Sequence, residues 1–229
     1  QILRRIRMKP RQLDILDGSP PCPPFSMAGN KREGWGLEKT VYGKKQRNIE
    51  DLTFDFIKIA DEIQPKVIVC ENVKGLTMSY ASDHLDKMVN GFRECGYQTV
   101  HRVLNAVDYD VPQKRERVFI VSVRNDILEN LGHHINGGMM FPDFSDRIFP
   151  RPNSYRYSQR DSIHDLLKNK DNIKEGKELE EIMKTNKKYP YLQQLPKDPK
   201  VYQSVGDINP TGNFFQTRRV PWDDASNTI

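Results

Sequence analysis

The fold is decided by the stretch Val67-Ile68-Val69-Cys70-Glu71-Asn72-Val73. Its first three residues are apolar and β-branched, which is typical of a short strand buried on both faces of a sheet. Residues 51–64 predict a helix just before this strand, and Pro65 ends it. The apolar face of that helix is formed by Leu52, Phe56, Ile59 and Ile63. A helix that leads into a buried strand is typical of open α/β sheets.

Strands and helices alternate on both sides of this unit. Further strands are predicted at Leu13–Leu16, Thr99–Leu104 and Val118–Val123. A second helix is predicted over residues 83–95, with Ser82 as its N-cap and Gly96 as its stop. Its apolar face is formed by Leu85, Met88, Val89 and Phe92. This order predicts an α/β fold, with a doubly wound, mainly parallel sheet and helices on both faces.

The second half of the chain has a different character. From about Asn125 the apolar periodicity fades, and several glycines and prolines interrupt the sequence. One helix is predicted to start at Ser162, with Asp165 three positions later. We therefore expect residues 1–124 to form the α/β domain and residues 125–229 to form a smaller, irregular region.

The composition excludes several classes of protein. Lys and Arg outnumber Asp and Glu by 36 to 31, a net charge of +5 that fits a nucleic-acid partner or an ordinary basic surface. The three cysteines are widely spaced, which argues against a disulfide framework and a C-x-x-C metal site. No apolar run approaches the roughly 20 residues that span a bilayer. We expect no membrane segment, no metal and a reducing, cytoplasmic setting.

Cys22 is the candidate nucleophile. It lies between Pro20-Pro21 and Pro23-Pro24, on a loop too stiff to continue a helix or a central strand. Such a loop can hold a thiolate in one place. The alternative is a small buried cysteine in a turn, which is the commoner role of a lone cysteine. Cys70 and Cys95 are assigned to that alternative role.

Two other segments bring polar side chains to strand ends, where open α/β sheets bind ligands. Glu71 is a candidate acid, because burial can keep a carboxyl protonated and able to donate to a ring nitrogen. Asn72 can fasten the neighbouring loop through its side chain. Gln113, Arg115 and Arg117 alternate in an extended stretch and are expected on one side, toward phosphate or a base carbonyl. The alternatives are a surface carboxylate and a charged edge strand.

These segments together resemble the DNA (cytosine-5) methyltransferases. Residues 18–29, which include Gly18-Ser19-Pro20-Pro21-Cys22, resemble the nucleophile loop of that family. Glu71-Asn72-Val73 resembles its E-N-V segment, and residues 104–117 resemble the segment that ends in Q-x-R-x-R. Order and spacing agree over residues 13–124. Two later stretches, residues 162–167 and 218–229, resemble segments that precede and end the target-recognition region.

The resemblance implies a Rossmann-like, S-adenosylmethionine-dependent methyltransferase fold and a covalent reaction on double-stranded DNA. In that reaction the target cytosine is flipped out of the duplex, and Cys22 adds to its C6 atom. Glu71 bonds N3 and the exocyclic amine, while Arg115, Arg117 or both hold O2. S-adenosylmethionine is the cofactor that supplies the methyl group to C5.

The resemblance also implies supporting roles. Substrate or loop support falls to Asn72, Gln113 and Ser26, a cofactor contact to Pro21, and DNA contacts to Arg218 and Arg219. Residues 1–124 become a partial catalytic domain, and residues 125–229 become a partial target-recognition region. The implied setting is the cytoplasm of a bacterial or phage-infected cell, for a restriction-modification, phage or solitary methylase.

The sequence departs from the family pattern in two respects. Pro23 stands where the family commonly has glutamine. The F-x-G-x-G cofactor loop, the acidic ribose-binding residue and the late G-N-x-V segment have no counterpart. We therefore expect the main cofactor site outside this sequence, in a longer monomeric protein or in a second subunit.

Three alternatives remain. An RNA cytosine methyltransferase of the same fold shares the three segments and differs in its nucleic-acid surface. A non-catalytic DNA-binding remnant predicts salt-dependent DNA affinity without methyl transfer. A cysteine hydrolase built on Cys22 needs a partner histidine, and the five histidines lie in no motif that provides one.

Overall fold

The computed structural model describes residues 3, 7–20, 40–41, 44–45, 49–79, 81–132, 146–163, 165, 177–178, 181, 184–185, 189–195, 203–204, 218–219 and 221–227. The chain divides into two compact units. The first comprises residues 1–104 and 116–151, and the second comprises residues 105–115 and 152–229. Among the described residues, no helix is both long and apolar enough to cross a membrane.

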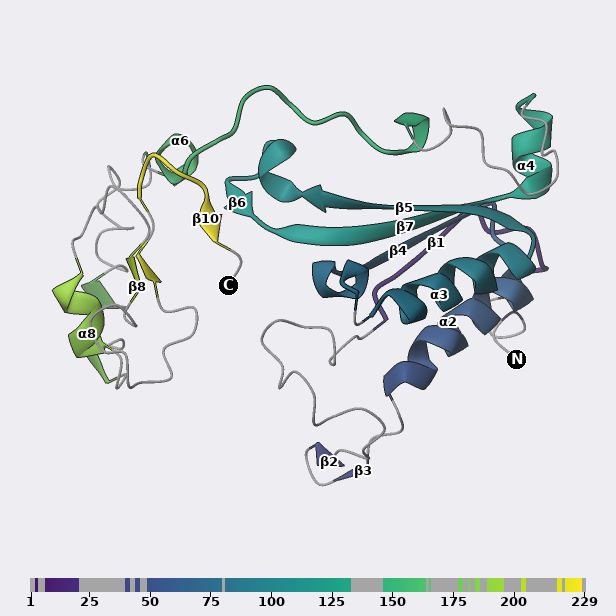
Figure 1. Cartoon of the computed structure of the whole chain (residues 1–229), viewed down its shortest axis with the longest axis horizontal. Helices are drawn as coiled ribbons and strands as arrows, with labels where there is room; N and C mark the ends of the chain where they lie inside the picture. Colours follow the sequence, from purple (N-terminus) through teal and green to yellow (C-terminus); the bar gives the residue numbers. More distant parts are fainter. Residues whose placement is uncertain are drawn as a thin grey trace. The chain divides into compact units, whose positions relative to one another are not determined.

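The first unit is built on a four-stranded sheet with the strand order β1-β4-β7-β5 (Figure 1). The strands are β1 (Ile15–Gly18), β4 (Val67–Val73), β5 (Tyr97–Asn105) and β7 (Glu116–Arg124). β1 runs parallel to β4, whereas β7 runs antiparallel to it. The predicted α/β class is confirmed. The direction of β7 differs from the expected parallel run, as is common for one strand of a large α/β sheet.

Apolar side chains cover both faces of the sheet. α2 (Ile49–Ile63) and α3 (Ser82–Glu94) lie side by side over one face (Figure 1). They pack against Ile68, Cys70, Val118 and Ile120 of the strands. Val121 and Val123 alternate with Val118 and Ile120 along β7, so they belong to the opposite face. There they pack with Val100, Phe149 and Leu128, the last from α4 (Asn125–Asn130).

The buried face of α2 differs from the predicted one. Leu52 is 45% exposed, whereas Thr53 and Ala60 are buried together with Ile57 and Ile63. The prediction followed only the large apolar residues, and it missed the small side chains that let the helix approach its neighbours. In α3 the four predicted apolar residues are all buried.

Two helix ends follow from local backbone chemistry. Gln64 follows α2 with a left-handed φ of 52°, and Pro65 then prevents the helix from continuing. Gly96 takes a φ of 89° after α3 and donates its N–H to the Arg93 carbonyl. Gly96 is therefore the predicted stop, and Pro65 ends α2 as expected.

Two predicted N-caps are wrong. Ser82 is the first residue of α3 rather than its cap, which is Ala81. In the second unit, α6 (Gln159–Ile163) contains Ser162 and is capped one turn earlier by a reciprocal pair. The Ser158 N–H donates to Asp161 at 2.8 Å, and the Asp161 N–H donates to the Ser158 hydroxyl at 3.2 Å. The S-x-x-D pattern occurs at both positions, and the structure uses the first.

The remaining elements are short. In the first unit they are β2 (Thr40–Val41), β3 (Lys44–Lys45) and η2 (Lys74–Thr77), with β2 antiparallel to β3. In the second unit they are η3 (Ala106–Asp108), β6 (Gln113–Lys114), α8 (Tyr189–Gln194), β8 (Gln203–Ser204), β9 (Arg218–Arg219) and β10 (Ser226–Asn227). β8 runs antiparallel to β9. β10 runs parallel to β6, with Ser226 opposite Gln113 and Asn227 opposite Lys114.

Candidate functional site

Glu71 and Arg117 form an ion pair near the carboxyl end of β4. Glu71 lies inside the strand rather than after it, because β4 continues to Val73. The Arg117 Nε lies 2.9 Å from the Glu71 Oε1, and the two side chains are 20% and 28% exposed. The register explains the contact, because Arg117 is opposite Val73 and therefore diagonal to Glu71 on the same face.

This ion pair fixes the orientation of both side chains. In the structure Glu71 faces the Arg117 guanidinium as its ion-pair partner. The role of Glu71 as an acid that donates to the base stays a prediction.

Asn72 fastens the loop that precedes Cys22. Its side chain is almost fully buried, with 3% of the residue exposed. The Nδ2 atom donates to the Pro20 carbonyl at 3.1 Å, and Oδ1 accepts from the Val73 N–H at 2.8 Å. The amide thus uses both of its ends, and it joins β4 to the residue two positions before Cys22.

Gly18 provides a second anchor for the start of that loop. It ends β1, and a Cβ atom placed there would lie 2.5 Å from the Phe56 Cε2 atom. The Phe56 ring comes from α2 and meets the Phe92 ring edge-on, with centroids 6.2 Å apart. Only glycine lets this ring cover the strand end so closely. No local sequence pattern predicts this role of Phe56, although the glycine beside the proline pairs is an available signal.

A second ion pair joins η2, which directly follows β4, to β7. The Lys74 Nζ lies 2.8 and 2.9 Å from the two carboxylate oxygens of Glu116. These side chains are 38% and 45% exposed, so solvent screens them more than it screens Glu71 and Arg117. No local sequence pattern predicts this ion pair, because its two partners lie in two different motifs.

Gln113 and Arg115 lie in the second unit, on a segment that is not continuously extended. The Gln113 N–H donates to the Val111 carbonyl at 2.7 Å, and the Arg115 N–H donates to the Gln113 carbonyl at 3.0 Å. Hydrogen bonds between residues two apart mark tight three-residue turns. The alternation predicted for Gln113, Arg115 and Arg117 is therefore interrupted, and a common side for the three does not follow from it.

Several predicted site residues lie outside what the structure describes. They are Cys22, Pro21 and Ser26. The backbone of Arg218 and Arg219 is described as β9, but their side chains are outside the described part. Their assigned roles remain predictions. Within the described ranges, no group of three or more His, Cys, Asp or Glu side chains is placed to hold a metal ion.

The other two cysteines occupy structural positions, as expected. Cys70 is fully buried in β4. Burial raises the pKa of the Cys95 thiol to about 11, and the nearby Asp61 carboxylate adds to the effect. A thiol with such a pKa is almost wholly protonated near neutral pH and is a poor nucleophile.

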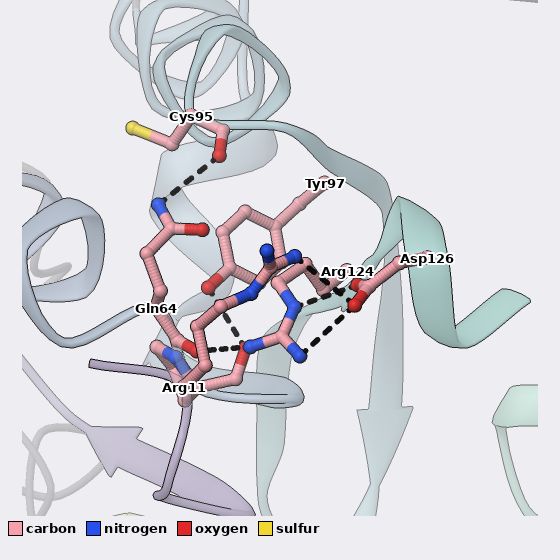
Figure 2. Close-up of polar contacts among 7 residues, drawn as sticks. Arg11, Gln64, Cys95, Tyr97, Arg124 and Asp126 are labelled. Atoms are coloured by element: carbon pink, nitrogen blue, oxygen red, sulfur yellow. Dashed lines mark hydrogen bonds and ion pairs between the residues drawn. The ribbon is translucent and has the colours of Figure 1, made fainter. Parts of the chain in front are cut away.

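A separate polar cluster lies at the other end of β4 and holds the fold together. Figure 2 shows Arg124, which is 5% exposed, reaching the Asp126 carboxylate and the Gln64 carbonyl. Arg11 bonds the same carboxylate at 3.0 Å, and the Tyr97 hydroxyl donates to the Pro65 carbonyl at 2.8 Å. Every contact here closes a helix or strand end, which marks a structural cluster.

Comparisons with known proteins point in one direction. The sequence model of the C-5 cytosine-specific DNA methylase family matches residues 3–215. The Type II methyltransferase M.Eco47II of Escherichia coli is 32% identical over 220 residues, which cover 95% of this chain and 48% of that protein. The Type II methyltransferase M.FnuDI of Fusobacterium nucleatum is 35% identical over 167 residues, which cover 72% of this chain and 40% of that protein.

One of the solved structures that the chain resembles is also from E. coli. It is a prophage-encoded candidate DNA modification methyltransferase of E. coli, with a TM-score of 0.47 and 20% identity. The match covers 71% of this chain and 37% of that chain. The chain thus spans about half or less of the length of the proteins it matches.

Proposed function

Because the chain belongs to the C-5 cytosine-specific DNA methylase family, we propose that it acts in an enzyme that methylates C5 of cytosine in double-stranded DNA. One arrangement carries the proposal. The Glu71–Arg117 ion pair adjoins Asn72, which holds Pro20 two residues before Cys22. The start of the nucleophile loop at residues 18–20, the E-N-V segment and the last arginine of the Q-x-R-x-R segment thus lie at one end of one sheet.

The chemistry needs each of these groups. C5 of cytosine is a poor nucleophile, so the Cys22 thiolate first adds to C6 of the flipped base, and electron density moves toward N3 and O2. Glu71 acts at N3 and the exocyclic amine, and Arg115, Arg117 or both act at O2, where the charge develops. C5 then takes the methyl group. Loss of the C5 proton to a base expels the Cys22 thiolate and restores the aromatic ring.

Two anchors position the thiolate for this attack. Asn72 holds the Pro20 carbonyl, and the Phe56 ring covers Gly18. Both contacts act on the loop rather than on the base. They limit the conformations that Cys22 can adopt, and a nucleophile held near its target gains rate through reduced entropy loss.

We propose S-adenosylmethionine as the methyl donor, which supplies an electrophilic methyl group on a sulfonium. The resemblance assigns a contact with it to Pro21, outside the described residues. Each step above therefore rests on groups that act on cytosine. The relatives M.Eco47II of E. coli and M.SPRI of a Bacillus phage support a place in the cytoplasm of a bacterial or phage-infected cell. There the enzyme serves restriction-modification or acts alone.

The test is transfer of a labelled methyl group from S-adenosylmethionine by the protein in its full natural length. Duplex DNA and transfer RNA are compared as substrates, with Cys22→Ser as the inactive variant and Cys95→Ser as its matched control. Labelled 5-methylcytosine in DNA, lost only in Cys22→Ser, is the expected result. Transfer to RNA alone supports the RNA alternative. Salt-sensitive DNA binding without transfer to either substrate supports the non-catalytic remnant.

A further inference from the structure

Three segments distant in the sequence meet around Asp224 in the second unit. They are residues 111–115, residues 158–161 and residues 221–227. The Asp224 Oδ2 lies 2.6 Å from the Lys114 Nζ, although the two residues are 110 positions apart. The main-chain carbonyl of Asp224 accepts from the Gln159 N–H at 3.0 Å. Asp224 therefore contacts both of the other segments.

The surrounding contacts hold Asp224 itself in place. Its Oδ1 accepts from the Ala225 N–H at 2.7 Å, and its own N–H donates to the Pro221 carbonyl at 3.2 Å. Ala225 is 3% exposed, and Pro221 is buried as well. An aspartate whose backbone and Oδ1 atom are already fixed can present its Oδ2 atom to Lys114 with little further loss of conformational entropy.

The same contacts secure the segment that carries Gln113 and Arg115. The Ser226 N–H donates to the Pro112 carbonyl at 2.8 Å, and β10 pairs with β6 alongside it. The Ala106 N–H donates to the Arg115 carbonyl at 3.0 Å. The two tight turns at residues 111–115 are thus held from both sides, and Lys114 is the residue between Gln113 and Arg115.

From this geometry we propose that Asp224 is a positioning residue for the reaction. Through Lys114 it sets the conformation of the segment that presents Gln113 and Arg115 to the target cytosine. The proposal rests on the proposed function, because Arg115 matters only if this segment meets the base. Nothing in the resemblance to the family assigned a role to Asp224 or Lys114.

Asp223 provides a matched control within the same turn. Its carboxylate pairs with the Arg160 Nε at 2.5 Å, and its side chain is 76% exposed, compared with 36% for Asp224. Asp223→Asn removes one carboxylate from the same region without touching the Gln113–Arg115 segment. A general effect of charge on DNA binding therefore appears in both variants, whereas positioning appears only in Asp224→Asn.

The first measurement is amide hydrogen exchange of Ser226 and Ala106 at low salt, which requires no activity. We expect Asp224→Asn to exchange about 3- to 5-fold faster at these amides, the range set by a partly exposed ion pair. The difference should shrink in high salt, because salt screens such pairs. Asp223→Asn should match the wild type. Unchanged exchange in Asp224→Asn, or equal changes in both variants, would overturn the proposal.

The second measurement is the rate of covalent trapping on duplex DNA that contains 5-fluorocytosine, with S-adenosylmethionine present. Asp224→Asn should raise the apparent KM for DNA about 3- to 5-fold and leave the KM for S-adenosylmethionine unchanged. The exchanged pair Asp224→Lys with Lys114→Asp should recover part of the loss.

Two further outcomes separate this proposal from the proposed function. Faster exchange with an unchanged KM for DNA makes Asp224 structural only and rejects the positioning role. Failure of the wild-type protein to form any adduct rejects the proposed function. The positioning role of Asp224 toward the target cytosine is then rejected as well. The exchange data then still show whether Asp224 fixes this segment.

Discussion

The Glu71 carboxylate and the Arg117 guanidinium meet at 2.9 Å across the antiparallel pair β4 and β7. The proposed reaction assigns these residues to neighbouring atoms on one edge of cytosine, Glu71 to N3 and the exocyclic amine and Arg117 to O2, so their contact has a chemical meaning. Each holds the other in place before the base arrives. A change at either residue is therefore expected to disturb the other, and their effects should not add.

Replacement of Arg117 tests this coupling. Arg117→Lys keeps the charge but loses the planar fork that binds Glu71 and a carbonyl oxygen together. We expect the rate of methyl transfer to fall about 100-fold, as for the loss of one donor at a developing charge. The double variant with Glu71→Gln should be little worse than the worse single variant. Transfer of labelled methyl groups to duplex DNA measures both.

Lys74→Met is the matched control for Arg117→Lys. It breaks a neighbouring ion pair that joins η2, just after β4, to β7, but the Lys74 and Glu116 side chains are 38% and 45% exposed. Such a pair contributes about 0–1 kcal/mol to stability. Activity near that of the wild type is expected, and an equal loss in both variants would show that the loss of either ion pair with β7 is damaging.

Asn72→Asp tests the anchor of the nucleophile loop. The aspartate still accepts from the Val73 N–H, but it cannot donate to the Pro20 carbonyl and brings a charge into a buried place. We expect a loss of about 1–3 kcal/mol in the free energy of unfolding, together with slower trapping of 5-fluorocytosine DNA. Urea unfolding and adduct rates, measured on the same samples, separate the two effects. Unchanged trapping would remove Asn72 from the positioning of Cys22.

Gly18→Ala tests the contact with Phe56. The added Cβ meets the ring at 2.5 Å, so the ring or the strand end must move. A destabilisation of about 1–3 kcal/mol is expected from this overpacking. Phe56→Leu in the same chain should relieve part of it. Gly91→Ala is the control, because its Cβ meets the Ile57 side chain less closely, at 3.0 Å from Cδ1 and 3.4 Å from Cγ2, and alanine favours the helix.

Asp126 makes the stability depend on pH. The hydrogen bond from Arg124 lowers the pKa of Asp126 below its usual value, and the charges of Arg124 and Arg11 act in the same direction (Figure 2). A carboxyl whose pKa is lower in the folded state stabilises the fold above its unfolded pKa, near pH 4. This contribution is lost as the pH falls below about 4 through the folded pKa.

The measurement is urea unfolding of Asp126→Asn and wild-type protein at pH 7 and in steps below pH 4. The difference in the free energy of unfolding between the two proteins should be largest at pH 7 and should vanish as the pH falls. Asp146→Asn is the control, because the Asp146 side chain is 77% exposed where it pairs with Arg102. A difference in the free energy of unfolding that stays constant down to acidic pH would show that Asp126 contributes nothing through its charge.

Local patterns predicted the elements around the site well. The apolar spacing of α3, the stop at Gly96 and the buried strand at Val67–Val69 all follow from near neighbours in the chain. Asn72 was expected to fasten a loop, and it does so at Pro20. Residues in short contiguous motifs can be interpreted because the chemistry that constrains them is local.

Other features depend on contacts that no local pattern encodes. The direction of β7, the register that sets Arg117 beside Glu71, and the pairing of Lys114 with Asp224 are set by tertiary packing. Thr53 and Ala60 were missed on α2 because small residues carry little apolar signal. At residues 158–165 two S-x-x-D patterns compete, and the contacts of Gln159 and Arg160 with residues 221–224 favour the first.

The most direct test of the central claim is the identity of the nucleophile. The protein, in its full natural length, is incubated with S-adenosylmethionine and a duplex that carries 5-fluorocytosine, and the product is digested and mapped by mass spectrometry. We expect one covalent adduct on the peptide that contains Cys22, absent in Cys22→Ser and unchanged in Cys95→Ser. An adduct on another residue, or none with a folded protein that binds this duplex, would contradict the assignment of Cys22 and the proposed function with it.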